Sequence, residues 1–244
     1  MKSVREHYDD FLGSVYSWIL GDFDDACARS RSLFESLGLE PGDGRLAVDL
    51  GAGPGTQTIP LAEREYAVVA VDFCAELLDE LKAHGGDLPV TNVRDDLLRF
   101  RRHIDGPAAL IVCMGDTLVH LPSHDAVTAL LDEVSAALAP GGRFVYSIRD
   151  YVSFVPEGGD RFVPVRASDE RIFTCFLEYG DDDVHVHDIL YRNVDGHWRM
   201  QVSDYRKLRL DCAVLNARLA SNGLVAAEPV EVDGLLVVSA RKPA

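Results

Sequence analysis

An apolar run that leads into three closely spaced glycines, "VDLGAGPGTQT" at residues 48–58, constrains the fold more than any other feature. The glycines at 51, 53 and 55 let the backbone turn sharply and approach a ligand without side chains in between. The spacing departs from the dinucleotide pattern G-x-G-x-x-G, because Thr56 stands where the third glycine should fall. The loop therefore predicts a nucleotide-like ligand that is not a dinucleotide.

Strand-like apolar segments alternate with amphipathic helical segments up to about residue 150. Such alternation is typical of parallel strands joined by helical crossovers. The sequence therefore predicts an α/β fold with a doubly wound sheet. The expected strands are residues 45–50, 66–73, 88–93, 108–114 and 143–148, and the expected helices include 75–82 and 125–138, the latter closed at 140–142.

After Asp150 apolar and polar residues alternate with a period of two. This pattern predicts an antiparallel meander, inserted before the last helix. We expect four parts: an N-terminal helical segment (1–40), a core (41–150), an antiparallel flap (151–210), and a last helix with a closing β-hairpin (211–244). The flap strands are expected at 171–179, 184–193 and 198–208, the helix at 212–222, and the closing strands at 224–232 and 235–240.

Composition limits the partners and the compartment. The formal net charge is −16, from 40 acidic and 24 basic residues, which disfavours nucleic acids and anionic membranes. We find no signal-peptide pattern and no apolar stretch of the roughly 18 residues that a membrane span needs. The five scattered cysteines fit reduced thiols, so we expect a cytoplasmic protein.

Acidic residues at the ends of three expected strands suggest what the loop binds. Asp49 precedes the glycines, where a carboxylate would attract a cationic group and repel a pyrophosphate; alternatively it only caps the loop. Asp72 suits the hydroxyls of a ribose, Phe73 can pack on a purine, and Asp95 or Asp96 can accept from an adenine amine. Together these features describe S-adenosylmethionine.

The pieces "VDLGAGPGT", "VDF", "RDDLLRF", "LIVCMGDTLVHLP" and "LAPGGRF" resemble the class I S-adenosylmethionine-dependent methyltransferases. The resemblance implies a seven-stranded Rossmann-like sheet of order 3-2-1-4-5-7-6, with the cofactor over the carboxyl ends of strands one to four and S-adenosylhomocysteine as the product. It implies that the cofactor site comprises Asp49, Gly51, Ala52, Gly53 and Gly55 at the methionine end, Asp72 and Phe73 at the ribose and purine, Asp96 or Asp95 with Leu97 at the adenine, and Met114 beneath the cofactor.

Two further segments, "CMGDTLVHLPS" and "SIRDY", resemble the small-molecule branch that contains the glycine and sarcosine N-methyltransferases. That branch also carries an antiparallel insertion after strand five. The resemblance implies that Arg149 and Tyr151 bind a substrate carboxylate; the alternative is an ion pair of Arg149 with Asp150 or Asp116. Asp116 and Thr117 depart from the branch, which usually has asparagine and serine there.

Candidate groups for the chemistry stand near these segments. Asp116 and His120 are expected on the acceptor side, where either could orient the acceptor or remove its proton; His120 could instead only hold the following loop. Tyr8 and Tyr16 in the first helix are expected either to close the site as a lid and contact substrate, as in relatives, or to pack in the core. His185 and His187 form the one metal-like string, and without an evident third ligand no metal site is expected.

These features predict an enzyme that methylates a nitrogen or oxygen of a small, possibly carboxylate-bearing metabolite. The alternatives are a non-catalytic S-adenosylmethionine-binding regulatory protein and a protein or RNA methyltransferase. The flap either caps the pocket within one chain or pairs with a second copy in a homo-oligomer.

Overall fold

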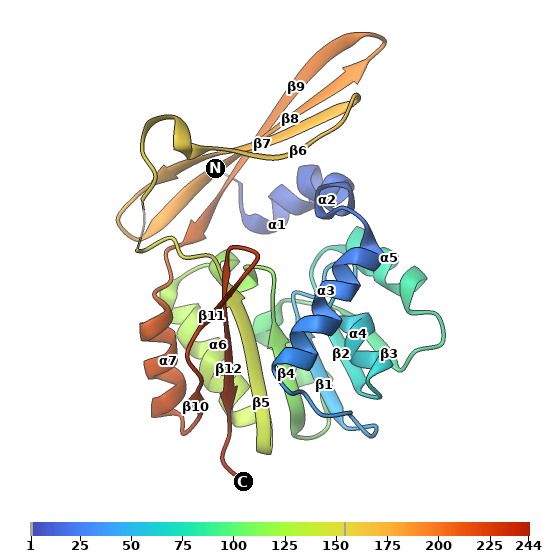
Figure 1. Ribbon diagram of the computed structural model, residues 1–244, viewed down its shortest axis with the longest axis vertical. Helices are drawn as coiled ribbons and strands as arrows, with labels where there is room; N and C mark the ends of the chain where they lie inside the picture. The colour runs from blue at the N-terminus through green and yellow to red at the C-terminus, as the bar shows by residue number, and fades with distance from the viewer. Residues whose placement is uncertain (1, 154) are drawn as a thin grey trace.

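A mainly parallel sheet forms the centre of the computed structural model, which describes residues 2–153 and 155–244 (Figure 1). The strand order is β10-β12-β5-β4-β1-β2-β3, with β11 also paired to β12, and only the strands on the β12 side run antiparallel to their neighbours. The predicted order 3-2-1-4-5-7-6 is confirmed, because β12 is the seventh strand and β10 with β11 forms the sixth. The strands are β1 (Leu46–Leu50), β2 (Ala67–Asp72), β3 (Val90–Arg94), β4 (Ala108–Cys113), β5 (Leu138–Ile148), β10 (Val225–Ala226), β11 (Val230–Val232) and β12 (Leu235–Arg241).

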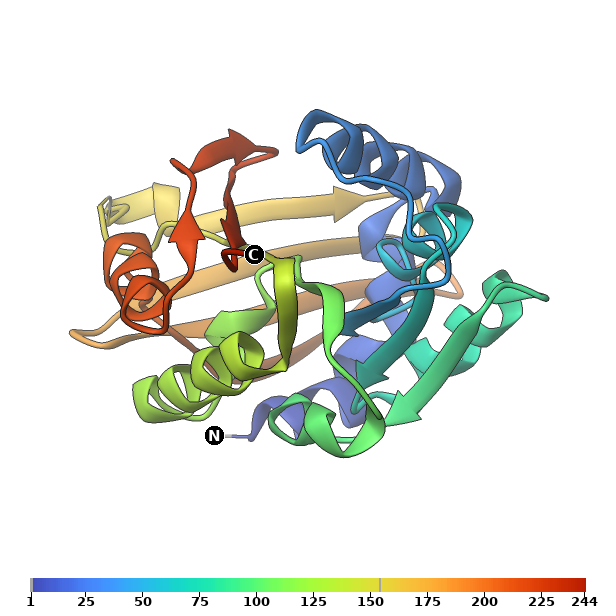
Figure 2. The ribbon, with the colours of Figure 1, turned by 90° about the horizontal axis from the view of Figure 1, so that it is seen from below.

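Helices cover both faces of this sheet (Figure 2). Successive side chains of a strand point to opposite faces, so Leu110 of β4 packs in the cluster with Phe34, while Ile111 packs in the cluster with Leu130. Both faces of the central strands are therefore buried, as a doubly wound fold requires. One face carries α3 (Phe23–Ser36), α4 (Thr58–Glu63) and α5 (Ala75–Gly85), and the other carries the 3₁₀ helix η2 (Leu97–His103), α6 (His124–Ala137) and α7 (Cys212–Ser221).

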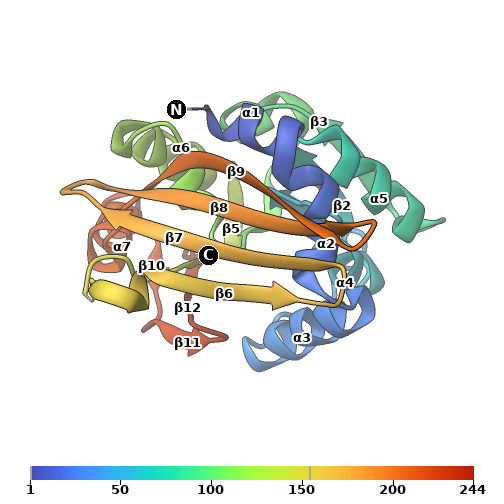
Figure 3. The same cartoon turned by 90° about the horizontal axis from the view of Figure 1, so that it is seen from above.

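The predicted flap is a separate antiparallel sheet that lies across the upper end of the core (Figures 1 and 3). Its order is β6-β7-β8-β9, so it has one strand more than the sequence predicted. The missed strand is an exposed edge that contains Pro164 and has no alternation of buried and exposed residues. The strands are β6 (Phe162–Ala167), β7 (Arg171–Tyr179), β8 (Asp183–Val194) and β9 (His197–Leu208), and the short helix η4 (Gly158–Arg161) precedes them.

The N-terminal helices lie between the flap and the core. They are α1 (Val4–His7), the π-helical turn η1 (Tyr8–Leu12) and α2 (Gly13–Leu20). Phe11 and Val15 pack on Phe173 and Leu190 of the flap. His7 is fully buried, with its Nε2 3.0 Å from Asp188 Oδ2. The flap therefore covers this end of the chain within one copy.

Two predicted boundaries are wrong. Strand β5 begins at Leu138, where a helix was expected to continue, because the chain pairs there with Ala108 of β4 before a bulge. The expected strand at 224–232 divides into β10 and β11, which flank Pro229, a residue that cannot donate a backbone hydrogen bond to a ladder. Among the described residues no helix is both long and apolar enough to span a bilayer.

Candidate active site

A cavity opens where β1, β2, β3 and β4 end, beneath the N-terminal helices. Parallel strands bring their carboxyl ends to one edge of the sheet, which is why residues from four separate segments meet here. The lining consists of Tyr8, Tyr16, Gly51, Gly53, Val71, Asp72, Phe73, Leu77, Asp95, Leu97, Gly115, Thr117 and His120.

The glycine loop forms the floor of the cavity. Gly51 has a φ of +79°, and a Cβ added there would lie 2.5 Å from Thr117 Cγ2. Gly55 has a φ of +102°, and a Cβ there would overlap Leu81 of α5. Gly55 thus permits the glycine loop to pack closely on α5. Ala52 and Gly55 do not line the cavity, whereas Gly51 and Gly53 do.

Asp72 and Phe73 line the cavity at the end of β2, as the sequence predicted. Asp72 Oδ2 accepts from the Gly53 backbone N at 2.9 Å, and Oδ1 accepts from the Cys74 backbone N at 2.8 Å. Burial raises the pKa of Asp72, and these backbone bonds oppose the rise. The Tyr8 ring meets Phe73 edge-on at 5.4 Å, which leaves Phe73 positioned to flank a planar ligand.

The two neighbouring acidic residues after β3 have different positions and partners. Asp95 lines the cavity, and its Oδ2 lies 2.8 Å from His103 Nε2, a contact that lowers the pKa of Asp95. Asp96 instead caps η2, with its Oδ1 accepting from the Leu98 backbone N at 2.9 Å, and lines an adjoining groove. This placement favours Asp95 over Asp96 as the adenine contact, with Leu97 on the same wall.

Asp49 and Met114 lie outside the cavity wall. Asp49 is 1% exposed beneath the loop, and its Oδ2 accepts from Thr58 Oγ1 at 2.6 Å. Its Oδ1 is buried without a hydrogen-bond partner among the described residues, and burial raises the pKa of Asp49 to about 7. Met114 lines a groove on the α3 side of the sheet instead. The prediction that Asp49 faces a cationic ligand group stays a prediction.

Aromatic side chains close the cavity from above. Tyr8 and Tyr16 lie 6.0 Å apart between ring centroids, and burial raises the pKa of both phenols. His120 lies in the same wall, between the Tyr8 ring at 6.0 Å and the Tyr205 ring at 5.5 Å. Burial holds the pKa of His120 well below its usual value, so its imidazole is neutral near pH 7. Within the described part of the chain, its buried Nδ1 has no hydrogen-bond partner.

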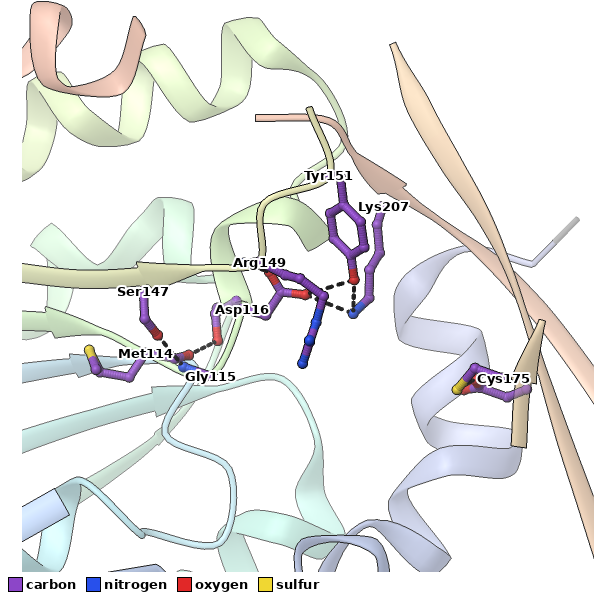
Figure 4. A network of polar contacts seen from close by, with 10 residues as sticks. Met114, Gly115, Asp116, Ser147, Arg149, Tyr151, Cys175 and Lys207 are labelled. Atoms are coloured by element: carbon purple, nitrogen blue, oxygen red, sulfur yellow. Dashed lines mark hydrogen bonds and ion pairs between the residues drawn. The ribbon is translucent and has the colours of Figure 1, made fainter. Parts of the chain in front are cut away.

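A second polar cluster joins the core to the flap next to the cavity (Figure 4). Lys207 Nζ lies 2.8 Å from Asp116 Oδ2, and Tyr151 donates to the same oxygen at 3.2 Å. The Asp116 carboxylate keeps the pKa of Lys207 well above its usual value despite burial. Asp116 Oδ1 accepts from the Arg149 backbone N at 2.8 Å.

Asp116 thus contacts the Arg149 backbone and the Tyr151 hydroxyl, and none of these three residues lines the cavity. The Arg149 side chain extends away from Asp116 (Figure 4) and lines a groove beside Gly234. Across residues 2–153 and 155–244, no carboxylate lies within ion-pair distance of it. Neither of the ion pairs considered for Arg149 is present.

The sequence did not predict Lys207 or Thr117 as site residues, whereas the resemblance places Gly115, with Met114, beneath the cofactor, and Gly115 lines the cavity. Thr117 follows Asp116 in a segment that the sequence had already singled out, so its place on the wall could have been inferred. Lys207 shares the period-two face of β9 with buried Tyr205, a signal that was available but that does not reveal Asp116 as its partner.

The charges of the cavity wall suit a cation. Two carboxylates, Asp72 and Asp95, line it, and His120 is neutral. Of the wall residues that the structure describes, none is a lysine or an arginine. A pyrophosphate would thus meet like charge, whereas a sulfonium or ammonium group would be attracted.

Comparisons with known proteins agree with this geometry. Residues 47–142 match the family described as "Methyltransferase domain". The chain is 32% identical over 120 residues to the cypemycin N-terminal methyltransferase of a Streptomyces species, covering 49% of this chain and 48% of that protein. It is 27% identical over 163 residues to the glycine/sarcosine N-methyltransferase of Halorhodospira halochloris, covering 64% and 58%. The core is a class I S-adenosylmethionine-dependent methyltransferase domain.

The chain spans about half the length of the curated relatives it matches. The likeness in fold extends beyond the methyltransferase core. The CcbJ methyltransferase from Streptomyces caelestis superposes with a TM-score of 0.75 at 19% identity, covering 97% of this chain and 98% of that one. The antiparallel flap and the N-terminal helices thus belong to an arrangement that other methyltransferases share.

Proposed function

We propose that this chain transfers a methyl group from S-adenosylmethionine to a nitrogen atom of a small molecule. The observation that carries the proposal is the single cavity that brings Asp72, Phe73 and Asp95 together with Tyr8, Tyr16 and His120. The first group suits a cationic adenine nucleoside, and the second encloses the space above the glycine loop. One relative is named a glycine/sarcosine N-methyltransferase, so the acceptor atom in its name is nitrogen.

Methyl transfer from a sulfonium is an in-line displacement in which a C–S bond breaks as an N–C bond forms. The acceptor amine must arrive neutral, and the product loses a proton after transfer. Positioning and exclusion of water therefore dominate the catalysis. The buried ring of His120 offers a neutral nitrogen that can accept such a proton, and Tyr8 and Tyr16 exclude solvent.

The position of Arg149 supports the proposal that the acceptor carries a carboxylate. Its exposed guanidinium, without an ion-pair partner in the described residues, can bind a carboxylate through two parallel hydrogen bonds. We expect Tyr151 to act indirectly, through its bond to Asp116. An uncharged acceptor would make no comparable use of this geometry.

The deciding experiment is a methyl-release assay of the purified chain over a panel of amines, amino acids and hydroxyl compounds. We expect turnover with an amine that carries a carboxylate and a 10- to 100-fold loss of kcat/KM in Arg149→Ala. Calorimetry with S-adenosylhomocysteine and NAD accompanies it, and tight binding of NAD alone would refute the cofactor. Cofactor binding without turnover across the panel would favour the non-catalytic alternative.

We also propose that the part of the outer flap face around Trp198 and Met200 pairs with a second copy of the chain. Trp198, Met200 and Val202 alternate along β9 and are 48–59% exposed. A face of this kind is usually covered. Light scattering should show a dimer for the natural chain and a monomer for the Trp198→Glu, Met200→Glu double variant. Val214→Glu, at a 65% exposed valine of α7, is the control that should stay dimeric.

A further inference from the structure

The outer face of the flap carries two histidines of β8 that converge on one carboxylate of β7. His187 Nε2 lies 2.6 Å from Glu178 Oε2, and His185 Nδ1 lies 3.7 Å from the same oxygen. The sequence showed the two histidines without a third ligand. Glu178 supplies it across the ladder, where it stands directly opposite His185. One ligand atom from each of the three residues lies within 4.8 Å of the others.

We propose that Glu178, His185 and His187 form a binding site for a divalent transition metal, with zinc as the best match. Two imidazole nitrogens and one carboxylate oxygen form a ligand set that suits zinc, cobalt or nickel rather than magnesium or calcium. A fourth position is left for water. The site lies on the flap, separate from the cofactor cavity.

A fourth residue, Asp204 of β9, orients the ligands. His185 Nε2 lies 2.8 Å from Asp204 Oδ2. The tautomer that carries its proton on Nε2, toward Asp204, leaves the lone pair of Nδ1 facing the Glu178 carboxylate, where a metal can bind. A carboxylate behind a histidine is the usual support of a metal ligand.

The distances allow a metal with small side-chain movements. Ligand atoms in a tetrahedral site with bonds of about 2.0–2.2 Å lie roughly 3.3–3.6 Å apart. The observed separations of 2.6 and 3.7 Å lie on either side of this range. The imidazoles are 26% exposed and Glu178 is 50% exposed, so an ion can reach them from solvent. A bound metal would join β7 to β8. Strand β8 in turn pairs with β9, where Val184 stands opposite Lys207.

The test is calorimetric titration of the chelator-treated, reduced full chain with zinc chloride alone. We expect one site per chain with a Kd in the micromolar range, and at least 100-fold weaker binding in the His185→Gln, His187→Gln double variant. Glu178→Gln should weaken binding at least tenfold, and Asp204→Asn about tenfold. His124→Gln, at an exposed histidine of α6, should bind as the natural chain does, and magnesium chloride should not bind.

Cobalt chloride gives an independent readout, since tetrahedral cobalt shows visible absorption bands that a merely structural change would not produce. Circular dichroism verifies that each variant is folded. Zinc that binds the double variant as tightly as the natural chain would place the metal outside this cluster and overturn the proposal. Absence of zinc binding by the folded natural chain would overturn it equally.

Discussion

Lys207 Nζ and Asp116 Oδ2 lie 2.8 Å apart and join strand β9 of the flap to the loop that follows β4. Both side chains are largely buried, with 14% and 8% of their surface exposed. The carboxylate also accepts from Tyr151 and from the Arg149 backbone, so it has partners on two segments, β9 and the segment after β5. The pair therefore fixes the flap beside the cavity.

Lys207→Met should lower the free energy of unfolding by about 3–5 kcal/mol, because it leaves a buried carboxylate without its cation. The Asp116→Asn, Lys207→Met double variant should recover part of that loss. Arg206→Met is the matched control, since Arg206 is 60% exposed in its pair with Asp183 and should change stability by less than about 1 kcal/mol. Urea unfolding measures all three, and equal losses at Lys207 and Arg206 would contradict the interpretation.

Gly51→Ala should impair both stability and cofactor binding. Its φ of +79° disfavours a side chain, and the added Cβ would lie 2.5 Å from Thr117. Gly44 has a similar φ of +74° with nothing within 4 Å of an added Cβ. Gly44→Ala should therefore cost only the backbone strain, about 1–2 kcal/mol. Thermal unfolding and calorimetry with S-adenosylhomocysteine compare the two, and similar behaviour of the variants would exclude a special role for the contact with Thr117.

The fold could be predicted because the sheet core depends on local patterns. The apolar runs and the helical periodicity between them identified all five parallel strands. The order of these strands followed from the resemblance to the methyltransferase family. Strand β6 was missed because an exposed edge strand with Pro164 carries no period. The start of β5 at Leu138 depends on its pairing with Ala108, which lies far away in the sequence.

The candidate site was predicted where strand ends determine it, and where the resemblance pointed to Tyr8, Tyr16 and His120. Asp72, Phe73, Gly51 and Gly53 follow strands directly, and the structure brings them to one cavity. Lys207 enters from the flap, and its position depends on how the two sheets pack. The choice between Asp95 and Asp96 depended on which one caps η2, a difference that adjacent identical residues do not reveal.

His120→Asn should lower kcat about 100-fold with the accepted substrate if the imidazole takes the acceptor proton. Because the pKa of His120 lies well below its usual value, the natural enzyme should show no inflection from this group between pH 6 and 9. The affinity for S-adenosylhomocysteine should change less than the rate does. His124→Asn on the surface is the control in the methyl-release assay. An unchanged kcat in His120→Asn would assign this residue to packing alone.

Asp49 should make the ligand-free protein less stable as the pH rises. Its pKa is about 7 in the folded chain against an ordinary value of 3.8, so the folded state retains a proton that the unfolded state releases. This contribution is complete below pH 3.8 and is lost as the pH rises through about 7. The difference between the two values is equivalent to roughly 4 kcal/mol.

Asp49→Asn keeps a polar side chain that does not titrate, so the variant should gain stability relative to the natural chain between pH 5 and 8. Asp105→Asn, at an exposed aspartate, should show no such trend. Urea unfolding at a series of pH values measures the difference. A cation bound at the glycine loop would favour the charged carboxylate, so at pH 8 S-adenosylmethionine should bind Asp49→Asn more weakly than the natural chain. Equal affinity, together with an intact pH trend, would restrict Asp49 to capping the loop through Thr58.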